Sequence, residues 1–247
     1  KDFLPEIPAI TEFTTRKTMG QDCDIMVAKH NVSREDQDLF AKRSHDNAEK
    51  AWEAGHHQKE VVPVEIEPDF KMIKKDNGIR SGTPIEKLNK LKPAFDKKHG
   101  TLTAANSSFL TDGSAVCLIM TESKAKELGL TPKAEIVDYC FTGQRLEDEL
   151  LLGPAYAMSK VLDQTKLSLN DIDVFEIHEA FAGQVLTNIK CLADDEFCKI
   201  ELQKEKPVGE ININKVNKWG GSLSIGHPFG ATGARLLTTA ANRLIEE

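Results

Sequence analysis

The residue of this chain best suited to chemistry is a histidine in a glycine-rich loop. His227 precedes Pro228 in a run, 220–235, that contains five glycines. Glycine lets a ligand approach the backbone closely, and proline restricts the chain after the histidine. A helix is expected over 236–244, so His227 is placed near a helix N-terminus, which favours an anion or a developing oxyanion. The simpler alternative is a glycine-rich turn that holds a structural histidine.

A second histidine follows an apolar segment upstream. Residues 173–177 predict a short strand, His178 comes directly after it, and a helix is expected from about Phe181 to Leu192. Strand followed by helix, repeated along the chain, indicates an α/β fold with a layered sheet. Ligands in such folds bind at the carboxyl ends of strands, where His178 would lie.

Other segments must position these two histidines. Ser33 is expected to cap a helix that buries one face and ends at Gly55, Thr121 to cap a helix near 122–128, and Pro154 to open a helix reaching about Leu162. The buried face would comprise Phe40, Ser44, Ala48, Ala51 and Trp52. Further strands are predicted over 60–66, with Pro63 suggesting an edge position, and over 115–120 and 134–137. The opening segment, 3–10, predicts an extended loop.

Composition excludes several classes of protein. The net charge of −7 argues against a dedicated nucleic-acid binder, and no run of 18 or more apolar residues predicts a membrane-spanning helix. The first residues lack the features of a signal peptide. The five cysteines form no Cys-x-x-Cys pair, which indicates free thiols and neither a disulfide framework nor a zinc site. Cys117, inside an apolar run, is expected to be buried.

One window reverses the overall charge. Residues 71–98 contain nine lysines and arginines against three acidic residues, a net charge of +6. The window is either an ordinary solvated surface or a patch that attracts an anionic substrate, and charge alone favours neither.

The two histidine segments together resemble the thiolase family. The resemblance rests on 217–235, on 177–181 with its His-Glu-Ala-Phe sequence, and on 33–38, 92–95 and 103–112 in the family's order. It covers essentially the whole chain. Most members of the family have asparagine at the position of His178. The histidine here resembles the one found in the β-subunits of the mitochondrial trifunctional enzyme.

The resemblance implies a fold and its division into domains. The fold would be the layered α-β-α-β-α arrangement with an inserted loop domain, the N-terminal core half being largely missing. Residues 1–110 would form the loop domain that binds coenzyme A. Residues 111–131 would end the N-terminal core domain, and residues 132–247 would form a truncated C-terminal core domain.

The resemblance also implies an activity, thiolytic cleavage of 3-ketoacyl-CoA by an acetyl-CoA C-acyltransferase. His227 would activate a cysteine nucleophile and contribute to the oxyanion site, and His178 would position a water there. Because a histidine titrates, a sharper pH dependence than with asparagine is expected. No metal or separate cofactor is implied, since coenzyme A is a substrate. Six residues would lie along the coenzyme A path: Met19, Arg80, Ala104, Ala105, Ser108 and Phe181.

Both catalytic cysteines of the family are expected to lie outside this chain, which alone would then be inactive. The alternative is a shortened protein that binds acyl-CoA or a partner subunit without catalysis. A condensing enzyme of the ketoacyl-synthase type, which uses a cysteine and two histidines, is a third interpretation. The implied partners are a second copy of the chain and the trifunctional α-subunit. The implied location is the mitochondrion, with peripheral association at the inner membrane.

Overall fold

The computed structural model describes residues 10–147 and 149–247, so the predicted opening loop lies almost entirely outside the described residues. The α-helices are α1 (Met19–Lys29), α2 (Arg34–Glu53), α3 (Ile85–Leu88), α4 (Glu122–Glu127), α5 (Gly153–Thr165), α6 (Ala182–Ala193), α7 (Asp195–Ile200), α8 (Ser222–Ile225) and α9 (Thr232–Glu246). The strands are β1 (Val64–Ile66) and β2 (Lys71–Ile73), and the 3-10 helices are η1 (His57–Lys59), η2 (Leu169–Asp171) and η3 (Ile213–Lys215).

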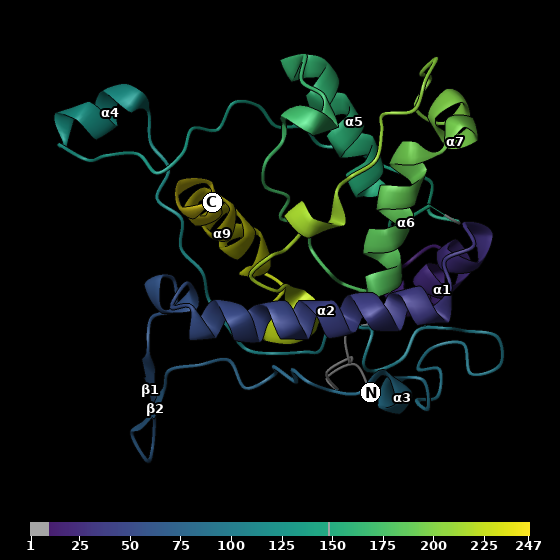
Figure 1. Cartoon of the computed structure of the whole chain (residues 1–247), viewed down its shortest axis with the longest axis horizontal. Helices are drawn as coiled ribbons and strands as arrows, with labels where there is room; N and C mark the ends of the chain where they lie inside the picture. The colour runs from purple at the N-terminus through teal and green to yellow at the C-terminus, as the bar shows by residue number, and fades with distance from the viewer. Residues whose placement is uncertain (1–9, 148) are drawn as a thin grey trace, which may run out of the picture.

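The long helix α2 lies between two parts of the molecule. In Figure 1, α5, α6, α7 and α9 lie on one side of α2, and β1, β2 and α3 lie on the other. The predicted face of α2 is confirmed, because Phe40, Ser44, Ala48, Ala51 and Trp52 are all buried. This face packs against α6 and α8, so α2 connects the helix that follows His178 with the loop that carries His227.

Local capping signals set several helix starts as predicted. The Ser33 side chain accepts from the Asp36 N–H at the start of α2, and Thr121 caps α4 in the same way through the Lys124 N–H. Pro154 lies in the first turn of α5, and the helix predicted after His178 is α6. Helix α1 was not predicted, although Thr18 and Gln21 form a capping box that would have indicated it.

The strand predictions are largely wrong. Only 64–66 of the segment 60–66 is a strand, and β2 is its unpredicted antiparallel partner, with Glu65 opposite Met72. The segment 173–177 makes a single parallel bridge, between Phe175 and Val216. Within the described chain, 115–120 and 134–137 make no backbone hydrogen bonds and are not strands. A strand forms only where a second segment completes its hydrogen bonds. Among the described residues, no such partner segment lies beside 115–120 or 134–137.

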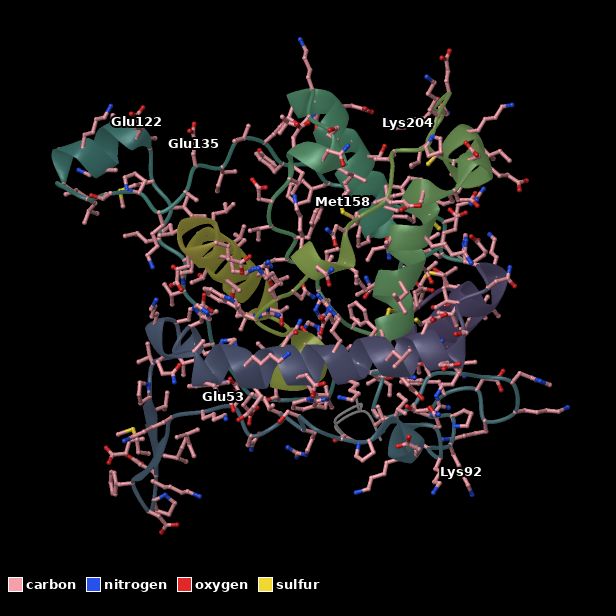
Figure 2. All side chains as sticks on the ribbon, in the orientation of Figure 1. Glu53, Lys92, Glu122, Glu135, Met158 and Lys204 are labelled. Carbon is pink, nitrogen blue, oxygen red and sulfur yellow. The ribbon has the colours of Figure 1, made fainter. Side chains whose placement is uncertain are left out.

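The hydrophobic core lies where α1, α2, α5 and α6 meet the segment before His178. Its fully buried members include Met26, Val185, Leu192 and Val216. By contrast, most apolar side chains of 115–120 are exposed to solvent, including Val116 at 88% and Leu118 at 77%. Cys117, predicted to be buried, is exposed for the same reason. The side chains of Glu122 and Glu135 lie on the arm that carries α4, away from the densely packed interior (Figure 2).

Candidate functional site

The two predicted histidines lie against each other. The ring centroids of His178 and His227 are 4.0 Å apart, with the ring planes tilted by 41°. They are 49 positions apart in the sequence, so tertiary packing alone creates the pair. The simpler interpretation, an isolated structural histidine in a turn, does not account for this arrangement.

The loop that carries His227 depends on a glycine with a positive φ. Gly226 has φ of +93°, and a Cβ at this position would overlap the side chain of Thr111. Next to it, the His227 N–H donates to the Phe109 carbonyl at 3.3 Å. Helix α9 begins five residues later at Thr232, which confirms that His227 lies near a helix N-terminus.

The backbone around His178 is held by the side chain of Asn217. This amide accepts from the Ile177 N–H at 2.8 Å and donates to the Ile177 carbonyl at 2.8 Å. It also donates to the carboxylate of Glu179 at 2.7 Å. Asn217 therefore fixes the residues on both sides of His178 and connects them to the glycine-rich loop.

Glu179 is a fully buried carboxylate that joins three elements. It accepts hydrogen bonds from the Ser44 hydroxyl of α2 at 2.7 Å, from Asn217 and from the Leu223 N–H of α8 at 3.3 Å. Burial raises its pKa, and these three donors oppose the shift. A Cβ at Gly221 would overlap the carboxyl group, so the glycine makes room for it.

A second buried charge cluster lies behind the histidines. Arg243, with no exposed surface, donates to Glu176 at 2.6 Å, to the Phe175 carbonyl at 3.2 Å and to the Lys215 carbonyl at 3.1 Å. Arg235 lies 3.8 Å from the other oxygen of Glu176 and donates to the Ser222 hydroxyl at 3.3 Å. The sequence analysis assigned no role to these residues, although Ser222 and Arg235 stand inside the glycine-rich run.

Both histidines are neutral at pH 7. Burial, together with the nearby His227 and Arg235, lowers the pKa of His178 to about 3. Burial and then Arg235 lower the pKa of His227. With a pKa of about 3, His178 carries no charge in the neutral range, and the sharper pH dependence expected of it stays a prediction for more acidic conditions.

Three of the six predicted coenzyme A residues line one pocket. A cavity of about 410 Å³ is bordered by Arg80, Ala104 and Ala105, together with Lys42 and His45. Phe109 and Leu223 also line it, and these two belong to the surroundings of His227 and Ser222. The pocket therefore adjoins the histidine pair.

His45 is a pocket residue that the sequence analysis missed. Its Nδ1 accepts from the Arg80 backbone N–H at 3.1 Å. Burial and the nearby Arg80 lower its pKa to about 4. Its position on α2, one residue after Ser44, places it on the edge of the buried face rather than on the solvated one.

The other three predicted residues are not among the described residues that line this pocket. The Ser108 N–H donates to the Ala180 carbonyl at 2.8 Å, close to His178 in the chain. Phe181 is buried, with its ring 5.6 Å from that of Phe95 in an edge-to-face contact. Met19, at the start of α1, is 37% exposed.

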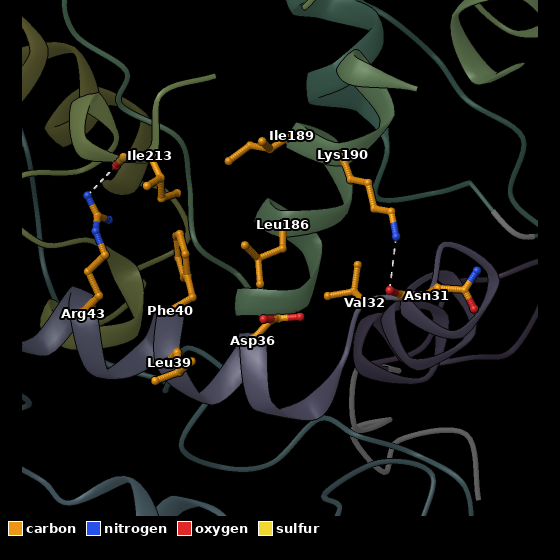
Figure 3. Close-up of a pocket in the computed structure, with 10 residues that line it drawn as sticks. All are labelled: Asn31, Val32, Asp36, Leu39, Phe40, Arg43, Leu186, Ile189, Lys190 and Ile213. Carbon is orange, nitrogen blue, oxygen red and sulfur yellow. Dashed lines mark hydrogen bonds between the residues drawn. The ribbon is translucent and has the colours of Figure 1, made fainter. Parts of the chain in front are cut away.

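A second pocket, of about 390 Å³, lies between α2 and α6 (Figure 3). Its apolar lining includes Phe40, Leu186 and Ile189. Its charged groups are already engaged, since Lys190 donates to the Asn31 carbonyl and Arg43 to the Ile213 carbonyl. None of the predicted site residues borders it.

Within the described part of the chain, no cysteine forms a hydrogen bond with His178 or His227. Cys191 lies 3.4 Å from His30, Cys198 contacts backbone carbonyls of α6, and Cys140 contacts the Ala157 carbonyl. Burial raises the pKa of Cys191 to about 12, which keeps it protonated. Over residues 10–147 and 149–247, no cluster of His, Cys, Asp or Glu could hold a metal ion, and no helix is long and apolar enough to cross a membrane.

Comparisons with known proteins cover nearly the whole chain. Residues 2–123 match the thiolase N-terminal domain and residues 130–247 the thiolase C-terminal domain. A protein of Caenorhabditis elegans named "Probable 3-ketoacyl-CoA thiolase" is 54% identical over 98% of this chain and 54% of its own length. The mitochondrial trifunctional enzyme subunit beta of Homo sapiens is 51% identical over 98% of this chain and 51% of its own.

Solved structures agree with this similarity. The acetyl-CoA acetyltransferase of Bacillus anthracis aligns with a TM-score of 0.83 at 38% identity, over 96% of this chain and 56% of that one. Human mitochondrial 3-ketoacyl-CoA thiolase in complex with CoA aligns with a TM-score of 0.79 at 30% identity, over 96% and 55%. The α/β fold class expected from the sequence is thereby confirmed, and the chain spans about half the length of the relatives it matches.

Proposed function

This chain belongs to the thiolase family, and on that basis we propose that it forms part of a 3-ketoacyl-CoA thiolase, an acetyl-CoA C-acyltransferase. The observation that carries the proposal is the pair of neutral histidines, 4.0 Å apart, beside a pocket that contains Arg80. Neutral imidazoles can both accept and donate a proton, as a reaction that activates a thiol and stabilises an oxyanion requires.

The proposed reaction shortens an acyl chain by two carbons. A thiolate attacks the 3-keto carbon, the bond between C2 and C3 breaks, and its electron pair takes up a proton to give acetyl-CoA. A coenzyme A thiol then removes the shortened acyl group. His227 would accept the thiol proton, and His178 would provide a hydrogen-bond donor, directly or through a water, for the oxygen that gains charge.

Coenzyme A would enter through the pocket that adjoins the histidines. Arg80 and Lys42 are cations at its border, and the lysine-rich window 71–98 adds long-range attraction for phosphate charges. Ala104 and Ala105 have small side chains that allow a ligand close to the backbone. In this proposal Ser108, Phe181 and Met19 contact the coenzyme farther along its path.

We propose further that neither the nucleophilic cysteine nor the acid/base cysteine is among the five cysteines of this chain. This chain alone is then inactive in thiolysis. Turnover of a 3-ketoacyl-CoA by the chain, abolished by alkylation of Cys140 or Cys191, would contradict this. None of the cysteines hydrogen-bonds to either histidine among the described residues, which also favours the second candidate, a protein that binds acyl-CoA or a partner subunit without catalysis.

The domain division, partners and location follow from the same proposal. Residues 1–110 would be the loop domain, 111–131 the end of the N-terminal core domain and 132–247 the C-terminal core domain. Relatives named as the mitochondrial trifunctional enzyme subunit beta support a mitochondrial location and an α-subunit partner. We also propose that the protein forms a homodimer and associates peripherally with the membrane, and these two proposals rest on the resemblance alone.

Calorimetric titration of the chain with coenzyme A tests the shared element of both candidates. We expect saturable binding that weakens about 10- to 100-fold in Arg80→Ala, as loss of a charge-assisted contact predicts. Lys92→Ala is the matched control, because it removes an exposed cation of the same window that does not border the pocket. An equal loss of affinity in both variants would mean that coenzyme A is attracted by the general positive charge and not by a specific contact in the pocket. If the parent chain did not bind coenzyme A, the proposal would be contradicted.

A further inference from the structure

Each histidine of the pair has its Nδ1 against a hydroxyl group. His227 Nδ1 lies 2.7 Å from the Thr232 hydroxyl, and His178 Nδ1 lies 2.9 Å from the Ser222 hydroxyl. Both hydroxyls are buried, Thr232 being 4% exposed and Ser222 fully buried. A hydroxyl can either donate to or accept from an imidazole nitrogen, so its other partner decides which of the two occurs.

For Thr232 the other partner is an acceptor. Its hydroxyl lies 3.1 Å from the Pro228 carbonyl, which can only accept, so the single hydroxyl proton points to that oxygen. The hydroxyl oxygen must then accept from His227, whose Nδ1 carries the hydrogen. This leaves Nε2 of a neutral His227 with a free lone pair.

For Ser222 the other partner is a donor. Arg235 Nη2 lies 3.3 Å from its hydroxyl, and a guanidinium can only donate. The serine proton is therefore available for His178. A buried hydroxyl proton without an acceptor costs free energy, so Ser222 is expected to donate it to the ring. His178 Nδ1 is then the acceptor, and Nε2 of the neutral ring carries the hydrogen.

We propose that Thr232 and the Ser222–Arg235 pair are positioning residues that hold the two histidines in opposite tautomers. His227 presents a proton acceptor at Nε2, and His178 presents a proton donor at Nε2. The inference deepens the proposed function and rests on it for its meaning, because a thiol needs a base while an oxyanion needs a donor. A fixed pair of opposite tautomers provides both without rearrangement during the reaction.

Charge supports this assignment. Burial and the nearby Arg235 lower the pKa of both rings, so neither becomes an imidazolium, which would carry hydrogen on both nitrogens at neutral pH. Arg235 itself stays charged and lies half-buried beside Glu176, which holds it where it can donate to Ser222.

The experiment is two-bond ¹H–¹⁵N correlation spectroscopy of the ¹⁵N-histidine-labelled chain at pH 7. His178→Asn and His227→Asn each remove one signal set and so assign the two rings among the seven histidines. We expect His227 to show a protonated Nδ1 and a bare Nε2, and His178 the reverse. The same tautomer for both rings, or an imidazolium pattern for either, would overturn the proposal.

Variants identify the hydroxyls as the cause. Thr232→Val should move His227 towards the Nε2–H tautomer, and Thr232→Ser should restore the parent pattern; an unchanged pattern in Thr232→Val refutes the role of Thr232. Ser222→Ala should likewise release His178 from its Nε2–H form, and an unchanged pattern there refutes the role of Ser222.

Matched controls separate these effects from a general disturbance of the helices. Thr239→Val is the control for Thr232→Val, because Thr239 is equally buried on α9 but bonds to Glu60. Ser224→Ala, on α8, is the control for Ser222→Ala, since its hydroxyl donates to the Gly221 carbonyl. Both controls should leave the two ring patterns unchanged, and a shift as large as in the test variants would contradict the assignment.

The test is independent of the proposed function. Tautomers are measured without coenzyme A, so opposite tautomers in a chain that fails to bind coenzyme A would contradict the function and retain the geometry. If the chain binds coenzyme A but both histidines have the same tautomer, the proposed function is retained and the tautomer proposal is contradicted.

Discussion

The histidine site and the segment 115–137 begin from similar sequence patterns and reach opposite structures. Each has a short apolar run followed by a helix, α6 after 173–177 and α4 after 115–120. Before His178, Phe175 and Ile177 are buried, and Lys215 and Asn217 complete their backbone hydrogen bonds. In 115–120 the same kind of run is largely exposed and makes no backbone hydrogen bonds to the other described residues. The difference is the presence of a second segment, which no local pattern supplies.

Charge pairs differ between the two regions in the same way. At the histidine site, Arg243 and Glu176 form a buried pair with further bonds to backbone carbonyls. On α4, Lys126 and Glu122 pair across one helical turn in solvent. A buried charge depends on its partner, whereas an exposed one is satisfied by water.

The largest effect should come from breaking the buried pair. Arg243→Met leaves Glu176 buried without its closest partner, and we expect the free energy of unfolding to fall by about 3–5 kcal/mol in urea denaturation. The matched change Lys126→Met should produce no measurable loss. Similar losses in both variants would contradict the contrast between the regions.

Apolar truncation should separate the regions next. Leu192, in the core, is fully buried, and Leu192→Ala should cost about 2–5 kcal/mol of stability because a cavity remains. Leu118 is 77% exposed, so Leu118→Ala should change stability by less than about 0.5 kcal/mol. If Leu118→Ala costs as much as Leu192→Ala, the segment 115–120 is packed in solution against something that the described chain does not provide.

Glycine substitution tests the loops themselves. Gly129 ends α4 with φ of +66° and open space around it, so Gly129→Ala should cost about 1–2 kcal/mol from backbone strain alone. At Gly226 the φ is also positive, and a Cβ would in addition overlap the side chain of Thr111. Gly226→Ala should therefore lower the free energy of unfolding by at least about 1 kcal/mol more than Gly129→Ala, in thermal or urea unfolding. Equal costs would show that the His227 loop shifts freely to accept a Cβ.

The last prediction concerns acid. The pKa of His178 is about 3 in the folded chain and about 6.5 in an unfolded one, so the unfolded state binds the proton first as the pH falls. The stabilisation from a neutral His178 is complete above pH 6.5 and is lost progressively towards pH 3. The parent should therefore lose up to about 1.4 kcal/mol per pH unit more than His178→Asn between pH 6 and pH 4. Parallel stability curves for the two proteins would contradict the depressed pKa.

Much of the helical structure was decided by local sequence. Ser33, Thr121 and Pro154 mark helix starts because a cap or a proline acts on the first turn alone, and the buried face of α2 follows from its spacing. The two histidine motifs were also recognisable locally, as was their resemblance to a family. The missed helix α1 carried a capping box, so that error lay in the interpretation and not in the sequence.

Tertiary structure decided what the sequence alone could not. The strands predicted at 115–120 and 134–137 and the burial of Cys117 depended on distant segments, and no local pattern states whether these are present. The contact of His178 with His227, and the hydroxyls of Ser222 and Thr232 that set their hydrogen-bonding roles, also depend on packing between remote residues. The sequence thus determined which groups can do chemistry, and the fold determined which of their nitrogens can accept a proton and which can donate one.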